Sequence, residues 1–237
     1  MTDLAAFGFF LPHDWLTLRQ VGDIFVHLAD EPMWMGGHVT KYASKSGVTT
    51  RAFMANPEPH HCNTFACYEF PVSVRCPHLI DTALRYADTV EEYFGQEPVL
   101  YSVNIFWSFP GGREPPEVQA WHRDVDDSSQ AAMFVYLTTV TPEEAHLYRG
   151  EGTEEREFTG DRGTFFIENP YGFHMGRHPQ KRSRLMAWAR FGVSDPPLSY
   201  GVDGLYQVEH PALWERLNDK QRRITRLIVK GAYELEV

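Results

Sequence analysis

Two stretches in the first half of the chain, residues 14–28 and 77–95, carry apolar residues at helical spacing. Asp14 can cap the first helix, and Gly95 is placed to end the second. The second helix is expected to pack across the outside of a sheet. The apolar positions of the two stripes are Leu18, Val21, Phe25 and Leu28, and then Ile80, Ala83, Leu84, Ala87, Val90 and Phe94.

Runs rich in β-branched and aromatic residues dominate the chain after the second helix, and such runs are typical of strands. A shorter alternating run, residues 64–70, precedes that helix, and residues 1–12 contain a strand-like FGFFL. The strands predicted after the helix cover residues 99–109, 132–140, 163–169 and 184–192. This order favours an α+β fold, because strands and helices do not alternate as they do in α/β proteins. The strands alone would indicate a sandwich or a barrel.

The C-terminal part of the sequence returns to a helical pattern near Pro211. Its buried face is expected to contain Leu213, Leu217, Ile224, Leu227 and Ile228. A chain of 237 residues is long enough for one sizeable core, so residues 1–237 are expected to form a single domain. Within it we expect a helix-rich part over residues 1–95, a strand-built core with the functional site over 96–195, and a helical tail over 196–237.

The composition narrows the classes of protein to consider. The formal net charge of −10 argues against nucleic-acid and anionic-membrane partners, since both attract basic surfaces. The start, MTDLAAFGFFLPHDW, lacks the basic opening of a secretory signal, and no apolar run approaches the length that spans a bilayer. Three cysteines are too few for a disulfide framework. We therefore expect a cytoplasmic protein.

The segment WHRDVDD contains the first candidate chemistry. If His122 lies on a strand or at its end, Asp124 emerges on the same face, because side chains two positions apart share a face. An imidazole and a carboxylate on one face, with a distant third ligand, make the 2-His-1-carboxylate facial triad of non-haem Fe(II) oxygenases. Such a triad leaves coordination positions open for a co-substrate and for dioxygen.

The order of four short elements resembles the 2-oxoglutarate-dependent Fe(II) dioxygenases, and within them the phytanoyl-CoA dioxygenase-like branch. The elements are HRD, GDRGTFF, FHMG and an arginine, Arg184, ten residues after His174. The resemblance covers about the C-terminal-central third of the chain. It implies a double-stranded β-helix (a jelly roll, cupin-like) with helices packed outside one sheet.

The resemblance also implies the cofactors and their ligands. Fe(II) would be held by His122, Asp124 and His174, and Arg184 would hold the far carboxylate of 2-oxoglutarate, since a guanidinium pairs bidentately with a carboxylate. The expected partners are a small-molecule substrate, 2-oxoglutarate and dioxygen. The usual outcome is hydroxylation, and desaturation or cyclisation would use the same kind of site.

Several alternatives stay open for these roles. His178 and His146 compete with His174, which is favoured by its offset to Arg184. Arg182 and Arg190 compete with Arg184; an extended strand places Arg184 and Arg190 on one face. Further contacts to 2-oxoglutarate are assigned to Asn104, on the face that carries Ser102, Phe106 and Ser108, and to Trp121, which could wall the pocket.

Two other stretches allow more than one interpretation. Residues 141–160 could form a solvated hairpin or a lid over the site. HHCNTFAC, residues 60–67, contains residue types that bind zinc, but its spacing matches no common zinc finger and free thiols in a strand are favoured. At the level of function, the alternatives are a cupin-like metal-binding module without turnover and a cupin-type oxygenase that does not use 2-oxoglutarate.

Overall fold

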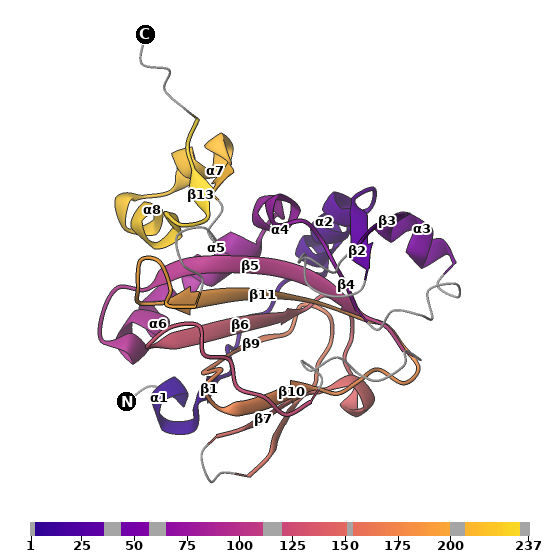
Figure 1. The fold of residues 1–237 in the computed structure, drawn as a ribbon, viewed down its shortest axis with the longest axis horizontal. Coiled ribbons are helices and arrows are strands. Elements are labelled where there is room, and N and C mark those ends of the chain that lie inside the picture. The colour runs from indigo at the N-terminus through magenta and orange to yellow at the C-terminus, as the bar shows by residue number, and fades with distance from the viewer. Residues whose placement is uncertain are drawn as a thin grey trace.

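The computed structural model describes residues 3–35, 44–56, 65–110, 120–150, 154–199 and 207–232. Their main feature is an eight-stranded antiparallel sheet, the large sheet, with the strand order β1-β9-β6-β11-β5-β4-β2-β3 (Figure 1). In chain order its strands are β1 (Phe9–Phe10), β2 (Pro32–Met35), β3 (Ser44–Thr49), β4 (Phe65–Cys67), β5 (Val99–Ser108), β6 (Gln130–Tyr136), β9 (Phe165–Glu168) and β11 (Arg184–Gly192).

A small sheet of three antiparallel strands faces one side of the large sheet. It consists of β10 (Phe173–Gly176), β7 (His146–Arg149) and β8 (Arg156–Phe158), in that order. In Figure 1 these strands lie below β6, β9 and β11. An aromatic cluster that includes Phe134, Phe158 and Phe166 fills the space between the two sheets. The inner face of this two-sheet arrangement is where the candidate site lies.

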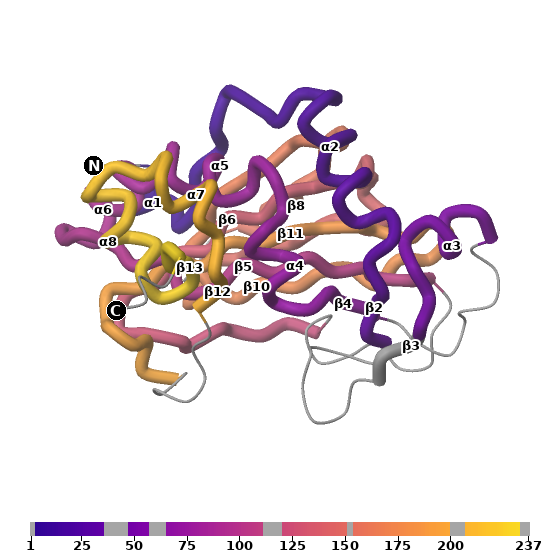
Figure 2. Tube along the Cα trace, turned by 90° about the horizontal axis from the view of Figure 1, so that it is seen from above, coloured from indigo at the N-terminus to yellow at the C-terminus, as the bar shows by residue number. Residues whose placement is uncertain are grey.

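Helices cover the opposite face of the large sheet, as Figure 2 shows from above. The helices that build this layer are α2 (Leu18–Leu28), α4 (Phe70–Arg75), α5 (Leu79–Arg85) and α6 (Ala87–Phe94), with α8 (Asp219–Thr225) against β5. Their apolar residues and the outward side chains of the strands form the larger core, which contains Ile24, Leu79 and Trp107. The α+β class and the layer of helices outside one sheet are therefore confirmed.

The remaining elements lie at the edges. They are α1 (Asp3–Phe7), α3 (Thr50–Ala55), a 3₁₀ turn over Pro142–Glu144, β12 (Val208–Glu209), α7 (Pro211–Arg216) and β13 (Val229–Lys230). The predicted burial of Leu213, Leu217, Ile224, Leu227 and Ile228 is confirmed. The single helix expected from Pro211 is wrong, because the segment forms two short helices, and Leu217, Leu227 and Ile228 lie outside them. In the described part of the chain, no helix combines the length and the apolar character needed to cross a bilayer.

Strand pairing explains which residues face the site. On β5 and β11 the partners are Ser108 with Arg184, Asn104 with Trp188 and Ser102 with Arg190. Because side chains alternate along a strand, all of these point to one side of the sheet. The same register continues onto β6 and β9, where Ala132 pairs with both Arg190 and Glu168. Inward polar residues thus occupy both ends of an otherwise aromatic face.

Several predicted boundaries are wrong for local reasons. Thr17 caps α2 through a reciprocal capping box with Gln20, whereas Asp14 pairs with Arg85 and Tyr86. The single helix predicted over residues 77–94 is two helices, which meet at Tyr86, although Gly95 does end the second one in a left-handed conformation. The predicted strand over 64–70 ends at Cys67, and β2 and β3 add strands where none was assigned, whereas β1 lies within the strand-like FGFFL as expected.

The segment 141–160 forms the 3₁₀ turn and then the β7–β8 hairpin of the small sheet. His146 and Tyr148 on this hairpin are buried, so this segment builds a wall of the fold. Its described residues are not placed as a lid. Residues 60–64 of the candidate zinc stretch lie outside the described residues, and Cys67 is a buried thiol in β4.

Candidate metal centre

A backbone bridge joins the two candidate histidines. His122 and His174 are 52 residues apart in the sequence, yet each donates its N–H to the other's carbonyl oxygen, with both N···O distances 3.0 Å. Opposed residues of such an antiparallel pair project their side chains to the same side. The imidazole ring centroids accordingly lie 4.2 Å apart. One pair of hydrogen bonds thus sets two of the three predicted ligands side by side.

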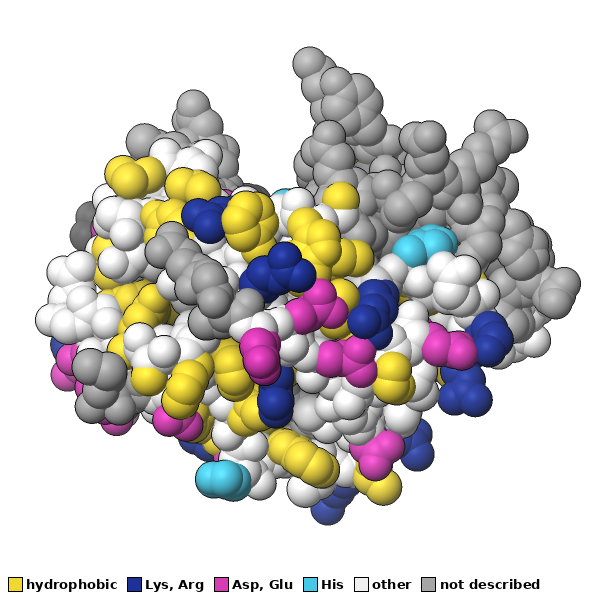
Figure 3. Space-filling view, turned by 90° about the horizontal axis from the view of Figure 1, so that it is seen from below, with side chains coloured by type: hydrophobic (Ala, Val, Ile, Leu, Met, Phe, Trp, Pro, Cys, Tyr) yellow, Lys and Arg dark blue, Asp and Glu magenta, His cyan; other side chains and the backbone are white. Residues whose placement is uncertain are grey.

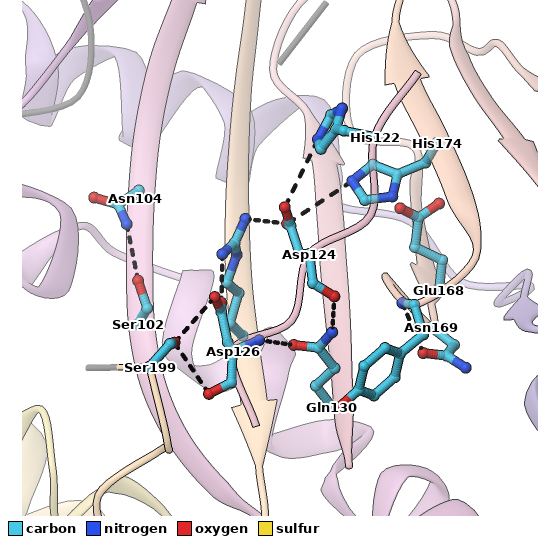
Figure 4. Close-up of polar contacts among 12 residues, drawn as sticks. Ser102, Asn104, His122, Asp124, Asp126, Gln130, Glu168, Asn169, His174 and Ser199 are labelled. Atoms are coloured by element: carbon cyan, nitrogen blue, oxygen red, sulfur yellow. Dashed lines mark hydrogen bonds and ion pairs between the residues drawn. The ribbon is translucent and has the colours of Figure 1, made fainter. Parts of the chain in front are cut away.

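Asp124 completes a group of three possible ligands. The Nε2 atom of His122 lies 3.7 Å from Asp124 Oδ1, and that of His174 lies 3.8 Å from Asp124 Oδ2. One ligand atom from each side chain lies within 4.8 Å of the other two. Figure 4 shows the Asp124 carboxylate turned toward both imidazoles. The structure therefore brings the three predicted ligands together.

The hydrogen bonds of the imidazoles leave their Nε2 atoms for a metal ion. His122 Nδ1 lies 2.8 Å from the Ala120 carbonyl oxygen, and His174 Nδ1 lies 3.1 Å from that of Gly172. A carbonyl oxygen can only accept, so Nδ1 carries the proton in each ring and donates it. Burial lowers the pKa of His174, which keeps this ring neutral. Neutral imidazoles oriented by backbone carbonyls are the usual form of metal-binding histidines.

A tight loop holds Asp124 in place. Its N–H donates to the Pro170 carbonyl oxygen at 3.0 Å, and its own carbonyl oxygen accepts from the buried Gln130 side chain. Gln130 also accepts from the Asp126 N–H at 2.9 Å. This amide, at the start of β6, therefore fixes the turn between the ligand segment and the strand that follows it.

Arg190 contacts the candidate metal ligand directly. Its Nη2 atom donates to Asp124 Oδ2 at 2.6 Å, and its Nη1 atom donates to Asp126 Oδ2 at 2.6 Å. The sequence left this arginine as an alternative to Arg184. It is buried and already engaged by two carboxylates, so it is not the arginine that awaits a dicarboxylate.

Arg184, the predicted anchor, has a different environment. It is 3% exposed, Nη1 donates to the Glu144 carbonyl oxygen, and Nη2 lies 3.5 Å from Ser108 Oγ. Its Nε atom is buried and has no hydrogen-bond partner among the described residues. Both hydrogen-bond acceptors of this guanidinium are neutral, and a buried guanidinium that is bonded to no carboxylate favours an anion, because burying a charge is costly.

Gly176 links this arginine to the metal ligands. A Cβ atom on Gly176 would lie only 2.5 Å from Arg184 Nη2, so a larger residue would displace the guanidinium. Gly176 follows His174 by two positions on β10, and therefore lies on the same face of the strand. The guanidinium of Arg184, which comes from β11, thus lies next to Gly176, the inward position of β10 that follows the candidate ligand His174.

His146 and Glu168 form a buried pair beside the site that the sequence did not predict. His146 Nε2 lies 2.9 Å from Glu168 Oε2, and the imidazole stacks on His174 at 5.6 Å between centroids. Burial raises the pKa of Glu168 to about 8, and burial next to Arg184 lowers the pKa of His146. A protonated Glu168 can then donate to a neutral His146. His146 is therefore a neighbour of the ligands and not the distal ligand itself.

The other candidates lie further from the ligand atoms. Asn104 is half-buried on the inner face of β5, where Nδ2 donates to Ser102 Oγ at 2.8 Å. Trp121 is 38% exposed, and its ring lies under the Arg149 guanidinium. Arg149 follows the buried Tyr148 on β7, so its side chain points to the outer side of the strand. That position does not favour a contact of Trp121 with 2-oxoglutarate. His178 is partly buried without joining the triad, and Arg182 is exposed.

Comparison with known proteins identifies the fold. No family model and no curated protein sequence matches this chain. Among solved structures, it is similar to the non-haem α-ketoglutarate-dependent epimerase SnoN from nogalamycin biosynthesis, with 15% identity over 78% of this chain and 77% of that one, at a TM-score of 0.53.

Two further structures have the same likeness. A 2-oxoglutarate–Fe(II) oxygenase family protein from Burkholderia pseudomallei has 13% identity over 80% of this chain and 86% of its own, at a TM-score of 0.54. HygX from Streptomyces hygroscopicus, with nickel, 2-oxoglutarate and hygromycin B bound, has 13% identity over 82% and 88%, at a TM-score of 0.52. The chain therefore has the double-stranded β-helix fold of the Fe(II)/2-oxoglutarate-dependent oxygenases.

Proposed function

We propose that this protein is an Fe(II)- and 2-oxoglutarate-dependent oxygenase that acts on a small molecule. The observation that carries the proposal is the buried Arg184 on β11, which donates to neutral acceptors and whose guanidinium lies against Gly176, two residues after His174 of the His-Asp-His group. Two neutral imidazoles and a carboxylate suit ferrous iron. A buried guanidinium suits the far end of a dicarboxylate that reaches toward the metal.

Each residue of the site has a role in this proposal. The Nε2 atoms of His122 and His174 and the Asp124 carboxylate would hold Fe(II), while Arg184 would bind and orient the far carboxylate of 2-oxoglutarate. The bound iron supplies dioxygen activation coupled to the oxidative decarboxylation of 2-oxoglutarate. The aromatic face around Phe134 and Phe166 excludes water from the space between the sheets. Asn104 remains a predicted contact.

The substrate is proposed at the level of a small molecule. The neighbours named above include a protein with hygromycin B bound and one from nogalamycin biosynthesis, which supports a metabolite rather than a macromolecule. The reaction is proposed to be hydroxylation, with desaturation or cyclisation as outcomes of the same site. Membership of the phytanoyl-CoA dioxygenase-like branch stays a prediction from the sequence.

An anaerobic spectrum tests the proposal. Fe(II)-loaded protein should develop a visible absorption band when 2-oxoglutarate is added under nitrogen, because direct chelation allows charge transfer from metal to ligand. Asp124→Ala should remove the band, with a loss of iron affinity beyond the ~10–100-fold typical of residues that only orient ligands. Asp88→Ala, which removes a carboxylate from α6, is the matched control and should keep the band.

The alternatives give different results. A metal-binding module without turnover would bind iron, but would show neither the band nor succinate release. A cupin-type oxygenase that ignores 2-oxoglutarate would consume dioxygen at the same rate with and without it. Either result would refute the proposed function.

A further inference from the structure

Arg190 stands at the centre of a charged network that includes the candidate metal ligand. Its guanidinium donates to Asp124 Oδ2 and to Asp126 Oδ2, both at 2.6 Å, and lies over the Trp188 ring at 4.3 Å from the centroid. The side chain of Arg190 is 11% exposed. A planar fork with a carboxylate on each side and an aromatic ring against its face has one orientation available.

Asp126 is itself fixed from several directions. Tyr101 donates its hydroxyl to Asp126 Oδ2 at 2.8 Å. Ser199 Oγ lies 3.3 Å from Asp126 Oδ1, as Figure 4 shows. The backbone N–H of Asp126 donates to Gln130. Residues from β5, β6, β11 and the segment after β11 therefore converge on the pair that holds Asp124.

The contact with Arg190 divides the two oxygens of Asp124. Oδ2 accepts the Arg190 hydrogen bond at 2.6 Å and lies 3.8 Å from His174 Nε2, while Oδ1 lies 3.7 Å from His122 Nε2. A carboxylate can bind a metal with one oxygen or with both. A charged hydrogen bond of 2.6 Å on one oxygen opposes its movement to the metal.

We propose that Arg190, backed by Asp126, is a positioning residue that holds Asp124 as a one-oxygen metal ligand. This inference rests on the proposed function. A one-oxygen ligand keeps the number of protein donors at three, so that 2-oxoglutarate finds two adjacent positions and dioxygen a third. Arg190 also balances one of the two carboxylates at this end of the site, which otherwise would repel a dianionic co-substrate.

Removing the guanidinium should therefore lower the affinity for the co-substrate without lowering the affinity for the metal. In Arg190→Leu, Asp124 is free to bind with both oxygens and the site gains one net negative charge. Affinity for the divalent metal alone should stay within a few-fold of the wild type or increase. Affinity for 2-oxoglutarate should fall by at least about tenfold, because a coordination position is filled and the charge opposes binding.

Titration calorimetry with Ni(II), and then with 2-oxoglutarate on the Ni(II)-loaded protein, measures both affinities without turnover. Arg190→Lys is the conservative variant. A lysine keeps the charge but cannot bridge two carboxylates as a fork, so its affinity for 2-oxoglutarate should stay several-fold below the wild type. Full recovery in Arg190→Lys would overturn the positioning role, because charge alone would then suffice.

Arg177→Leu is the matched control. Arg177, directly after β10, also joins two carboxylates, with Nη2 3.7 Å from Glu155 and Nη1 2.5 Å from Glu157. Acidic and basic side chains lie next to one another on this side of the molecule (Figure 3). Its loss should leave both affinities unchanged. If Arg190 only stabilised the fold, Arg190→Leu would weaken metal and co-substrate alike and lower the Tm; that result would also overturn the proposal.

The same titrations separate the two proposals. If Ni(II) binding is insensitive to His122→Ala and Asp124→Ala, the proposed metal centre itself is wrong. If those changes abolish Ni(II) binding while Arg190→Leu leaves the affinity for 2-oxoglutarate at the wild-type value, only the role of Arg190 is wrong.

Discussion

At the residue scale, the two inward arginines of β11 differ in what compensates their charge. Arg190 lies between two carboxylates, whereas Arg184 has backbone and hydroxyl oxygens around it. Both are buried, and both share one face of the strand. This difference in partners, and not a difference in burial, is the reason for proposing that Arg190 positions Asp124 and that Arg184 binds an external anion.

Asp127 shows how a carboxylate near the site contributes to stability instead of to binding. It accepts from the N–H groups of Val193 and Ser194, each at 2.7 Å, from the Ser194 hydroxyl, and from the Ser128 N–H. Burial alone would raise the pKa of Asp127, but these hydrogen bonds outweigh burial and lower it. The charged form is therefore the one that ties the ligand segment to the end of β11.

Asp127→Asn should cost about 2 kcal/mol of unfolding free energy at neutral pH, since an amide cannot accept all of these bonds. Because the pKa of Asp127 is lower in the folded state, its stabilisation is complete above the unfolded pKa of about 4 and disappears as the pH falls through the folded value. Urea unfolding of both proteins between pH 3 and 7 should show the difference shrinking toward acid. A difference that is constant across this range would contradict the charged role.

The sequence predicted the candidate ligands better than the residues around them. His122, Asp124 and His174, which the structure brings together, and the proposed anchor Arg184 could be singled out because their order along the chain is itself a pattern. The clamp by Arg190, and the pairing of His146 with Glu168, depend on which strands are neighbours. Nothing within the segment WHRDVDD distinguishes Asp126 from any exposed acid, so this part of the site required the tertiary structure.

At the scale of elements, β10 and the loop before it place His174. The Gly172 carbonyl orients the imidazole, and Gly172 itself lies against the hydroxyl end of Tyr148. Tyr148 is buried, and Gly8 approaches the same hydroxyl from another side. The Tyr148 ring therefore has no room to move away from position 172. A side chain at that position must displace the loop that contains Gly172 instead.

Gly172→Ala should destabilise the protein by about 1–3 kcal/mol through overpacking. It should also weaken metal binding about tenfold, because the carbonyl that orients His174 moves. Gly22→Ala in α2 is the matched control: a Cβ there meets nothing within 4 Å, so it should stabilise by about 0.5–1 kcal/mol. Thermal unfolding and Ni(II) titration of both variants check this; wild-type metal affinity in Gly172→Ala would refute the role of the loop.

The two longest strands were predicted from the sequence with nearly correct bounds, and the three strands of the small sheet were not predicted. The strand predicted over residues 184–192 matches β11, and that over 99–109 matches β5 within one residue. Each has enough residues for alternation and β-branched content to dominate. β7, β8 and β10 have three or four residues each, so their pairing is decided by partners far along the chain.

At the scale of the whole molecule, the large sheet separates two kinds of interior. Its outer face and the helices enclose an aliphatic-rich core, while its inner face and the small sheet enclose aromatic rings together with the polar groups of the site. The core between the outer face and the helices stabilises the large sheet, so charged residues can be tolerated on its inner face. A ligand that binds between the two sheets should thus stabilise the folded state of the entire domain, because it binds only when both sheets are in place.

This linkage gives a test that needs no turnover. At free concentrations about 100 times Kd, a ligand adds about 2.7 kcal/mol to stability, or roughly 5–10 °C in Tm for a chain of this size. Ni(II) should raise the Tm of the wild type, and 2-oxoglutarate should raise it again only when Ni(II) is present. Arg184→Leu should keep the first rise and lose most of the second, since about 3–4 kcal/mol of charged hydrogen bonding to the far carboxylate is gone.

A second rise of wild-type size in that variant would mean that 2-oxoglutarate lies elsewhere. A rise with 2-oxoglutarate alone would mean that its binding does not require the metal.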